Sequence, residues 1–271
     1  MDFDGLKYSK KEGTREPDRE PVNEQIFVDE VLDAIDETVS TDYQKGVPEV
    51  DVSRIFTVSG GTLRERNYFE QWKDAKRLAI VFVSELGKGL IPEEMVKIAN
   101  DSIALGYFID IYGTKREYLD GDDIYLIQDV DHYGLELKNY YTQDKTQNNY
   151  QWIISNPCFE IWLYYHYDSS TEQLEESRSM LPKCRSSWLK EKIPHLINGG
   201  INPKKTIDRI STAIINAKEH IAFDDDFPAL FSTEMFIVAE RIISIMKDEL
   251  ATLICRRAEY AKQQRELFKK S

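Results

Sequence analysis

Short apolar runs alternate with amphipathic segments through the middle of the chain. Runs rich in Val, Ile, Phe and Tyr predict four strands, at residues 53–58, 77–85, 122–131 and 150–155. Each run is followed by a segment whose apolar positions have helical spacing, at residues 64–75, 91–108, 133–147 and 156–167. The third of these segments fits either a helix or a loop. This strand–helix order predicts an α/β fold, a mostly parallel sheet flanked by helices.

The pattern changes at both ends of the chain. After Asp168 the spacing predicts helices joined by Gly and Pro loops, at residues 173–199, 205–223 and 232–268. The first fifty residues are an acidic N-terminal extension, with 14 Asp and Glu against 6 Lys and Arg. We therefore divide the chain into this extension at 1–50, a sheet domain at 51–168, and a helical region at 169–271 that completes or caps the sheet domain.

The N-terminal extension contains one amphipathic segment. The apolar positions with the spacing of one helix face are Ile26, Phe27, Val31, Leu32, Ile35 and Val39. Such a helix packs either on the main body of the chain or on another protein, and the sequence leaves both open. The acidic charge of the extension also suits it to cover a basic groove.

Composition limits the classes of function. The net charge of −13 argues against binding of nucleic acid through bulk charge, because phosphate affinity comes from clustered Lys and Arg. A local basic patch stays open, and bound cations or a partner protein could supply positive charge. The chain has no run of 18 apolar residues and no basic leader, which predicts a cytoplasmic protein without a membrane span. The three cysteines lack zinc spacing and are expected to be reduced.

The third predicted strand ends in two aspartates one residue apart, in the segment IYLIQDVDHYG. Side chains at i and i+2 of a strand share a face, so Asp129 and Asp131 point together if the strand extends to both. In parallel sheets, ligands bind beyond the carboxyl ends of the strands. Paired carboxylates there suit Mg²⁺, which takes one or two carboxylates plus water and substrate phosphate. An exposed loop, or a cap of the next helix, explains the same pair without a metal.

The segment NPCFEIWLYYHY after the fourth strand adds an acidic residue near the same edge of the sheet. Pro157 suits the first position of a helix, with Asn156 or Ser155 as the cap. Glu160 then lies in the first turn, where it either completes a metal site or compensates the helix dipole. His166 lies one turn after the buried stripe of this helix, as a substrate contact or as a structural hydrogen-bonding residue.

Together these residues resemble the RloB family, a group of Toprim-like proteins linked to prokaryotic defence against phage. The resemblance depends on the segments RIFTVSGGTLRERNYFEQW, YLIQDVDHYG, ISNPCFEIWLYYHY and AIINAK, which occur in this order and span roughly residues 53–245. It implies a Toprim-like domain that binds Mg²⁺ or Mn²⁺ and acts on nucleic acid. By the same resemblance, Asp129, Asp131 and Glu160 are the metal ligands and the catalytic residues.

The first carboxylate of the family pattern, E-G-x-T-E-x-x-Y-F, has no direct counterpart in this chain. Ser59 stands in its place, and a neutral hydroxyl is a poor substitute for a carboxylate ligand. Either another carboxylate completes the site, from Glu65, Glu85 or Glu160, or the domain binds its ligand without cutting it.

Two functions are therefore open. The first is a metal-dependent nuclease of antiviral defence that cuts DNA or RNA, with substrate contacts from Lys88, Arg64, Arg66, Asn156 and His166. The second is a catalytically degenerate Toprim-like module that binds nucleic acid, a nucleotide or a partner protein such as an ATPase.

The helical stretch at 234–268 offers a surface for a homo-oligomer or, through its basic end, for nucleic acid. An unrelated phosphotransferase is disfavoured, because the chain lacks the G-x-x-x-x-G-K-[ST] and G-x-G-x-x-G motifs.

Overall fold

A computed structural model describes residues 52–130, 133–144, 149–170, 172–174, 176, 186–247 and 249–270. The N-terminal extension with its predicted amphipathic helix lies outside the described residues, as does Asp131. All described residues belong to one compact unit, Val50–Ser271.

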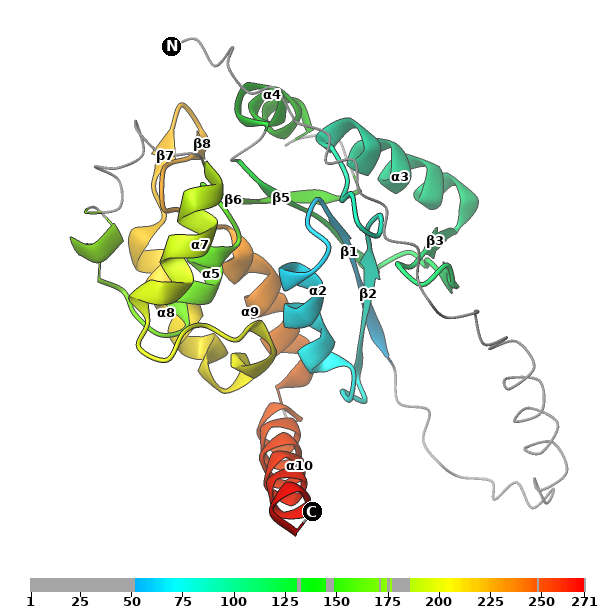
Figure 1. The fold of residues 1–271 in the computed structure, drawn as a ribbon. Helices are drawn as coiled ribbons and strands as arrows, with labels where there is room; N and C mark the ends of the chain where they lie inside the picture. Colours follow the sequence, from blue (N-terminus) through cyan, green and yellow to red (C-terminus); the bar gives the residue numbers. More distant parts are fainter. Residues whose placement is uncertain are drawn as a thin grey trace, which may run out of the picture. The chain divides into compact units, whose positions relative to one another are not determined.

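A four-stranded parallel sheet forms the centre of this unit, in the order β2-β1-β5-β6 (Figure 1). Its strands are β1 (Ser53–Ser59), β2 (Leu78–Val83), β5 (Asp123–Asp129) and β6 (Gln151–Ser155), each at a predicted strand position. The register places Phe56 of β1 beside Val81 of β2 and Ile124 of β5. These strands are largely buried, because helices cover both faces, as their near-continuous apolar runs require.

Two hydrophobic clusters, one on each face of the sheet, hold the helices in place (Figure 1). Helices α3 (Pro92–Leu105) and α4 (Gly134–Asp144) pack on the face that carries Phe56 and Leu126. The opposite face carries Ile55 and Ile127 and is covered by α2 (Arg64–Phe69), α5 (Glu160–Tyr165), α8 (Ile210–His220) and α9 (Met235–Met246). This three-layer arrangement confirms the predicted α/β fold with a helical C-terminal part.

Several element boundaries differ from the prediction. The helix predicted at 91–108 ends at Leu105, because Gly106 takes a left-handed conformation with φ 74°. The stretch predicted as helical at 232–268 divides into α9 and α10 (Leu250–Lys270). Pro157 is not the first residue of a helix: the Asn156–Pro157 bond is cis, and α5 begins at Glu160.

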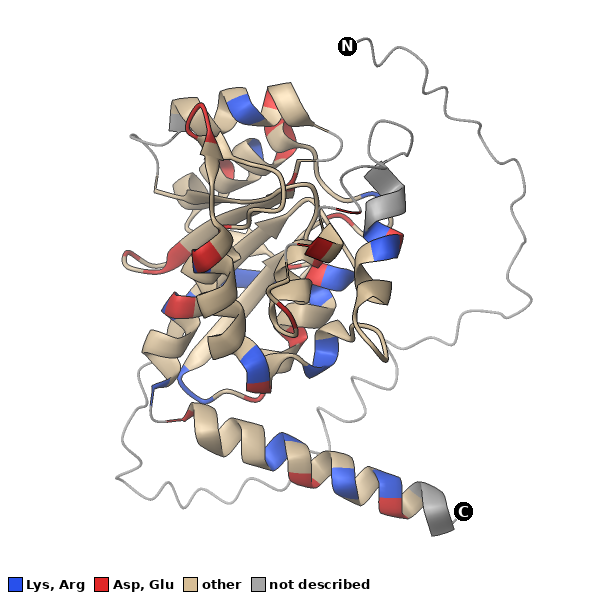
Figure 2. Ribbon diagram, turned by 90° about the vertical axis from the view of Figure 1, so that its left-hand side faces the viewer, with Lys and Arg blue, Asp and Glu red and all other residues tan. Residues whose placement is uncertain are grey.

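The remaining elements are short or lie in the C-terminal part. They are η1 (Glu70–Trp72), the hairpin of β3 (Tyr107–Ile109) and β4 (Lys115–Glu117), α7 (Ser186–Leu196), η3 (Pro203–Lys205), η4 (Ile207–Arg209), and the pair β7 (Phe223–Asp224) and β8 (Phe227–Pro228). From Ala258 to Leu267, all side chains of α10 except Gln264 are exposed, and both signs of charge occur along the helix (Figure 2). None of the helices in the described parts is long and apolar enough to cross a membrane.

Candidate functional site

The order in which the chain adds strands to the sheet reverses at β1, so that β2 and β5 lie on opposite sides of β1. From β1 the chain passes to β2 on one side, and it then returns through α3 to β5 on the other side of β1. Ligands of open α/β sheets bind beyond the carboxyl ends of the strands at such a switch point. The ends of β1 at Ser59 and of β5 at Asp129 therefore define the candidate site.

Asp129 is the last residue of β5, and its side chain is 13% exposed. Its Oδ2 lies 2.9 Å from Nζ of Lys190 in α7. The backbone after Asp129 stays attached to the sheet, because the Val130 N–H donates to the Ser155 carbonyl at 3.1 Å. Asp129 is thus held at the carboxyl edge of the sheet with a cation beside it.

Glu65 of α2 supplies a second carboxyl group at this edge. It is 7% exposed, and a Cβ atom at Gly61 would lie 2.1 Å from its carboxyl carbon. The carboxyl group therefore packs directly on the backbone of Gly61, two residues after the end of β1. Burial, followed by the negative charge of Asp129, raises the pKa of Glu65 to about 7. Asp129 is therefore close enough for its charge to disfavour ionisation of Glu65.

Ser59 stands at the position where the resemblance implies a carboxylate. Its side chain contacts the loop that follows β1. Its side chain is fully buried, and its Oγ accepts a hydrogen bond from the Gly61 N–H at 3.2 Å. The Ser84 hydroxyl donates to the carbonyls of Ser59 (2.9 Å) and Gly61 (3.1 Å) and stabilises the same loop. Ser59 therefore shapes the turn, and the carboxyl group that packs on this turn, at Gly61, comes from Glu65.

Arg64 connects Glu160 to α7. Its Nη1 forms an ion pair with Glu160 Oε1 and donates a hydrogen bond to the Lys190 carbonyl at 3.0 Å. Glu160 is the first residue of α5 and is 2% exposed, and its Oε2 has no hydrogen-bond partner among the described residues. One oxygen of this carboxylate is therefore neutralised, and the other is buried with unused acceptor capacity.

We expect Arg64→Ala to lower the free energy of unfolding by about 3 kcal/mol, because it leaves the Glu160 carboxylate buried without its counter-charge. Adding Glu160→Gln should recover most of this loss. As a control, Lys218→Ala breaks an exposed pair with Glu240 and should cost less than about 1 kcal/mol. Urea unfolding of the wild type and the three variants measures the free energies of unfolding. Equal small losses in Arg64→Ala and Lys218→Ala would contradict a buried ion pair at Glu160.

Sequence reasoning missed two residues of this site, Lys190 and Gln128. Lys190 lies on a predicted helix, and no local signal connects it to Asp129. Gln128 is buried, and a Cβ atom at Gly60 would lie 1.8 Å from its Oε1, so this approach needs glycine. The two adjacent glycines after β1 were the available signal that side chains from elsewhere pack on this loop.

Lys88 and Arg66, predicted to contact substrate, make their ion pairs elsewhere. Lys88 is exposed in the loop after β2, where its Nζ lies 2.9 Å from Glu94 and 3.5 Å from Glu85. Arg66 Nε lies 3.7 Å from Glu70, one turn further along the chain. The structure thus brings Arg64 into contact with Glu160, whereas Lys88 contacts Glu85 and Glu94 and neither Asp129 nor Glu160.

Asn156 and His166 stabilise the segment around α5. The Asn156 side-chain amide donates to the Pro228 carbonyl at 2.8 Å. His166 is 1% exposed between the rings of Trp162 and Tyr68, and its Nδ1 lies 2.9 Å from the Trp162 carbonyl oxygen. Burial lowers the pKa of His166 to about 3, so the imidazole is neutral at physiological pH. Both side chains make structural contacts in this fold.

The donors for a metal ion at this edge are carboxylates. Within the described residues, no group of three His, Cys, Asp or Glu side chains is placed to hold a metal ion. The described part of the site contributes the neighbouring pair Glu65 and Asp129, with Glu160 on Arg64. Asp131, the predicted third acid, lies outside the described residues.

Comparison with known proteins assigns the chain to a family. The family described as RloB-like protein matches residues 55–242, which is more than half of the chain. The matched range includes Glu65, Asp129, Glu160 and Lys190. Neither the curated proteins nor the solved structures that were searched gave a match. On the extent of the family match, the chain belongs to the RloB-like protein family.

Proposed function

We propose that the chain is a metal-dependent nuclease that cleaves phosphodiester bonds of DNA or RNA. The observation that carries this proposal is the pairing of the Glu65 and Asp129 carboxyl groups at the switch point of the sheet. The charge of Asp129 adds to burial in raising the pKa of Glu65, so ionising both acids together is costly, and a bound divalent cation would relieve that cost. A role in antiviral defence is inferred from the resemblance to the RloB family.

A Mg²⁺ or Mn²⁺ ion fits the donors of this site. Mg²⁺ needs only one or two protein carboxylates and keeps several waters, which Glu65 and Asp129 satisfy, with Asp131 as a further acid in the sequence. When bound, such an ion supplies Lewis acidity and a water of lowered pKa. The unused Oε2 acceptor of Glu160 supports a role for that residue in orienting water.

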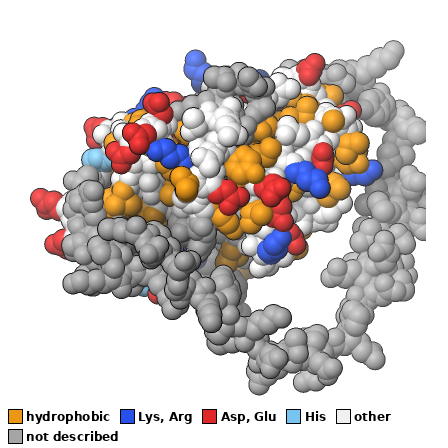
Figure 3. Space-filling view, turned by 90° about the horizontal axis from the view of Figure 1, so that it is seen from above, with side chains coloured by type: hydrophobic (Ala, Val, Ile, Leu, Met, Phe, Trp, Pro, Cys, Tyr) orange, Lys and Arg blue, Asp and Glu red, His pale blue; other side chains and the backbone are white. Residues whose placement is uncertain are grey.

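Lys190 and Arg64 are the cations of the proposed site. Lys190 neutralises Asp129, so a divalent ion on Asp129 would leave the Lys190 ammonium available to a phosphate oxygen of the substrate. Arg64 holds the Lys190 backbone and so keeps that ammonium at the sheet edge. On the face seen from above, acidic, basic and hydrophobic side chains are interspersed (Figure 3). In the proposed function, phosphate binding depends on individual cations such as Lys190 and Arg64.

The same ion pairs favour one alternative, a catalytically degenerate module. Lys190 and Arg64 already neutralise Asp129 and Glu160, so these acids have counter-charges without a metal. Such a module would bind nucleic acid, a nucleotide or a partner protein such as an ATPase. Self-association into a homo-oligomer is compatible with both the nuclease and the module.

Titration of Mn²⁺ into the full-length protein, beside a cleavage assay with labelled single-stranded DNA, duplex DNA and RNA, separates the two functions. The nuclease requires saturable Mn²⁺ binding and cleavage of at least one substrate that stops when the ion is chelated. Binding of Mn²⁺ without cleavage of any substrate would favour the module. Absence of both binding and cleavage would remove the proposed metal site.

We expect Gly61→Ala to weaken Mn²⁺ binding at least about tenfold, because the added methyl group needs the space that the Glu65 carboxyl group occupies. Gly134→Ala is the matched control, since nothing lies within 4 Å of its added Cβ atom. Isothermal titration of both variants provides the comparison. An unchanged Mn²⁺ affinity in Gly61→Ala would exclude Glu65 as a ligand.

A further inference from the structure

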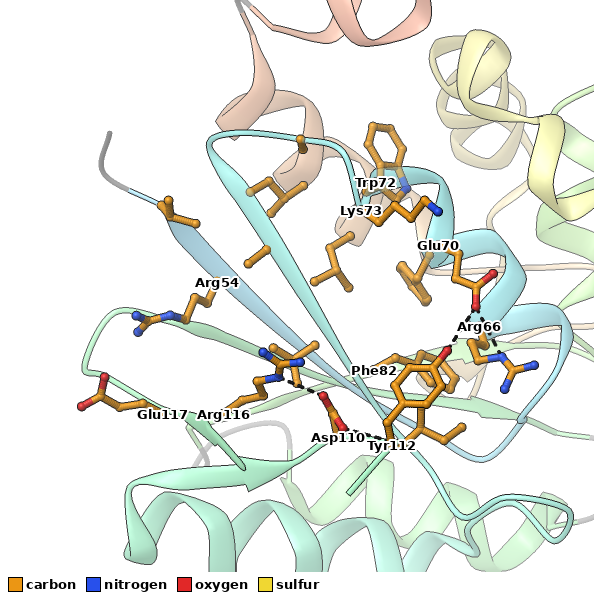
Figure 4. Close-up of a pocket in the computed structure, with 18 of the residues that line it drawn as sticks. Arg54, Arg66, Glu70, Trp72, Lys73, Phe82, Asp110, Tyr112, Arg116 and Glu117 are labelled. Carbon is orange, nitrogen blue, oxygen red and sulfur yellow. Dashed lines mark hydrogen bonds and ion pairs between the residues drawn. The ribbon is translucent and has the colours of Figure 1, made fainter. Parts of the chain in front are cut away.

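A groove of about 900 Å³ runs along the outer edge of the sheet, on β2. The strand crosses its centre, with α2 and η1 on one side and the β3–β4 hairpin on the other (Figure 4). Its floor is apolar and includes Ile80, Phe82 and Phe69. The groove shares none of its lining residues with the acidic site, so it is a separate binding surface.

The groove contains an open sheet edge. β2 pairs with β1 on one side only, and successive residues of a strand direct their backbone groups to opposite edges. The Arg77 carbonyl accepts from Ser53 on the β1 side, whereas the Phe82 carbonyl accepts from the Ile111 N–H on the outer side, at 3.0 Å. By this alternation, Ile80 directs its N–H and C=O outward. Among the described residues, the bond to Ile111 is the one backbone hydrogen bond that the outer edge makes.

Positive charge predominates around this edge. The residues lining the groove include six cations against three acids, in a chain whose net charge is −13. The acids are partly neutralised within the groove, because Asp110 pairs with Arg116 at 2.9 Å and Glu70 faces Arg66 at 3.7 Å. The other positive charges include Lys73, Lys76 and Lys115, which are exposed and have no ion-pair partner among the described residues.

We propose that this groove binds an extended acidic peptide segment of a partner protein, which adds to the sheet as a strand beside β2. The outward backbone groups of β2 would pair with the peptide backbone, as in other cases of strand addition. Alternate side chains of the peptide would meet the apolar floor and the three lysines. A nucleic acid strand is a poorer match, because it has no backbone N–H donors for an open sheet edge. This inference does not depend on catalysis at the acidic site.

Fluorescence anisotropy of the full-length protein with a labelled, alternating Val-Glu decapeptide tests the proposal. We expect saturable binding, and at least about tenfold weaker binding after N-methylation of the peptide backbone, which removes its donors. The triple variant Lys73→Glu, Lys76→Glu and Lys115→Glu should lose a similar factor through charge repulsion. The matched control reverses Lys97, Lys247 and Lys262, which are exposed outside the groove, and should bind like the wild type.

Three results would overturn the proposal. These are no binding of the decapeptide, equal binding by wild type and the groove variant, and equal binding of the methylated peptide. If an oligothymidylate displaces the peptide and loses its own affinity in the groove variant, the groove belongs to nucleic acid instead. Circular dichroism confirms that each variant is folded before it is compared.

Discussion

Asp129→Asn should reduce Mn²⁺-dependent cleavage by more than about 100-fold. Removing a group that only positions a metal ligand typically costs about 10- to 100-fold, and Asp129 is proposed to be a ligand itself. The change removes one of the two neighbouring carboxylates at the switch point while keeping the size of the side chain. It also takes away the partner of Lys190 and one cause of the raised pKa of Glu65. Cleavage rates at saturating Mn²⁺, together with Mn²⁺ titration, measure the effect.

Asp123→Asn is the matched control for this experiment. Asp123 begins the same strand and pairs with Arg241 at 2.7 Å, at the opposite end of β5 from Asp129. Both variants lose one negative charge from one strand, and only Asp129→Asn should lose activity. Full activity in Asp129→Asn would place the chemistry elsewhere. Equal loss in both variants would indicate damage to the strand rather than to a site.

Glu65→Gln should remove a pH dependence of stability that the wild-type protein shows in the absence of metal. The pKa of Glu65 rises from 4.5 to about 7 on folding, first through burial and then through the charge of Asp129. Between these values the folded protein holds a proton that the unfolded chain has released, so the free energy of unfolding falls as the pH rises. The contribution is fully present below about pH 4.5 and is lost by about pH 7, and it amounts to on the order of 3 kcal/mol.

Metal binding should show the opposite pH dependence, because a carboxyl group must lose its proton to bind the ion. The Mn²⁺ affinity of the wild type should therefore increase as the pH rises through about 7. In Glu65→Gln, Mn²⁺ affinity should be low throughout, and the metal-free protein should be more stable than the wild type at about pH 8.

Urea unfolding and isothermal titration at about pH 5 and about pH 8 provide both comparisons. Glu85→Gln is the control, since the Glu85 side chain is 55% exposed, and it also tests the other acid considered for the missing carboxylate. If Glu65→Gln keeps the wild-type pH dependence of stability, its carboxyl group does not titrate as proposed. If Glu85→Gln rather than Glu65→Gln lowers Mn²⁺ affinity, the site must be reassigned to the loop after β2.

The sequence by itself determined the layers of the fold and the position of Asp129 at the end of a strand. Strand and helix periodicities are local properties, so the four parallel strands and most flanking helices could be predicted from the spacing of apolar residues. The same local pattern predicted that Asp129 lies at the end of a buried strand and that Glu160 lies in the first turn of a helix. The predicted start of this helix at Pro157 was wrong, since α5 begins three residues later, at Glu160.

Only the tertiary structure decided which residues meet at the carboxyl edge. The order β2-β1-β5-β6 makes β1 and β5 neighbours and creates the switch point between them. Glu65, Glu85 and Glu160 could each replace the absent carboxylate at Ser59, and the tertiary structure places Glu65 near Asp129. The tertiary structure also brings Lys190, from a helix far along the chain, to Asp129. These contacts depend on strand order and on the packing of α2 and α7, and such long-range pairings leave no periodic signal in the sequence.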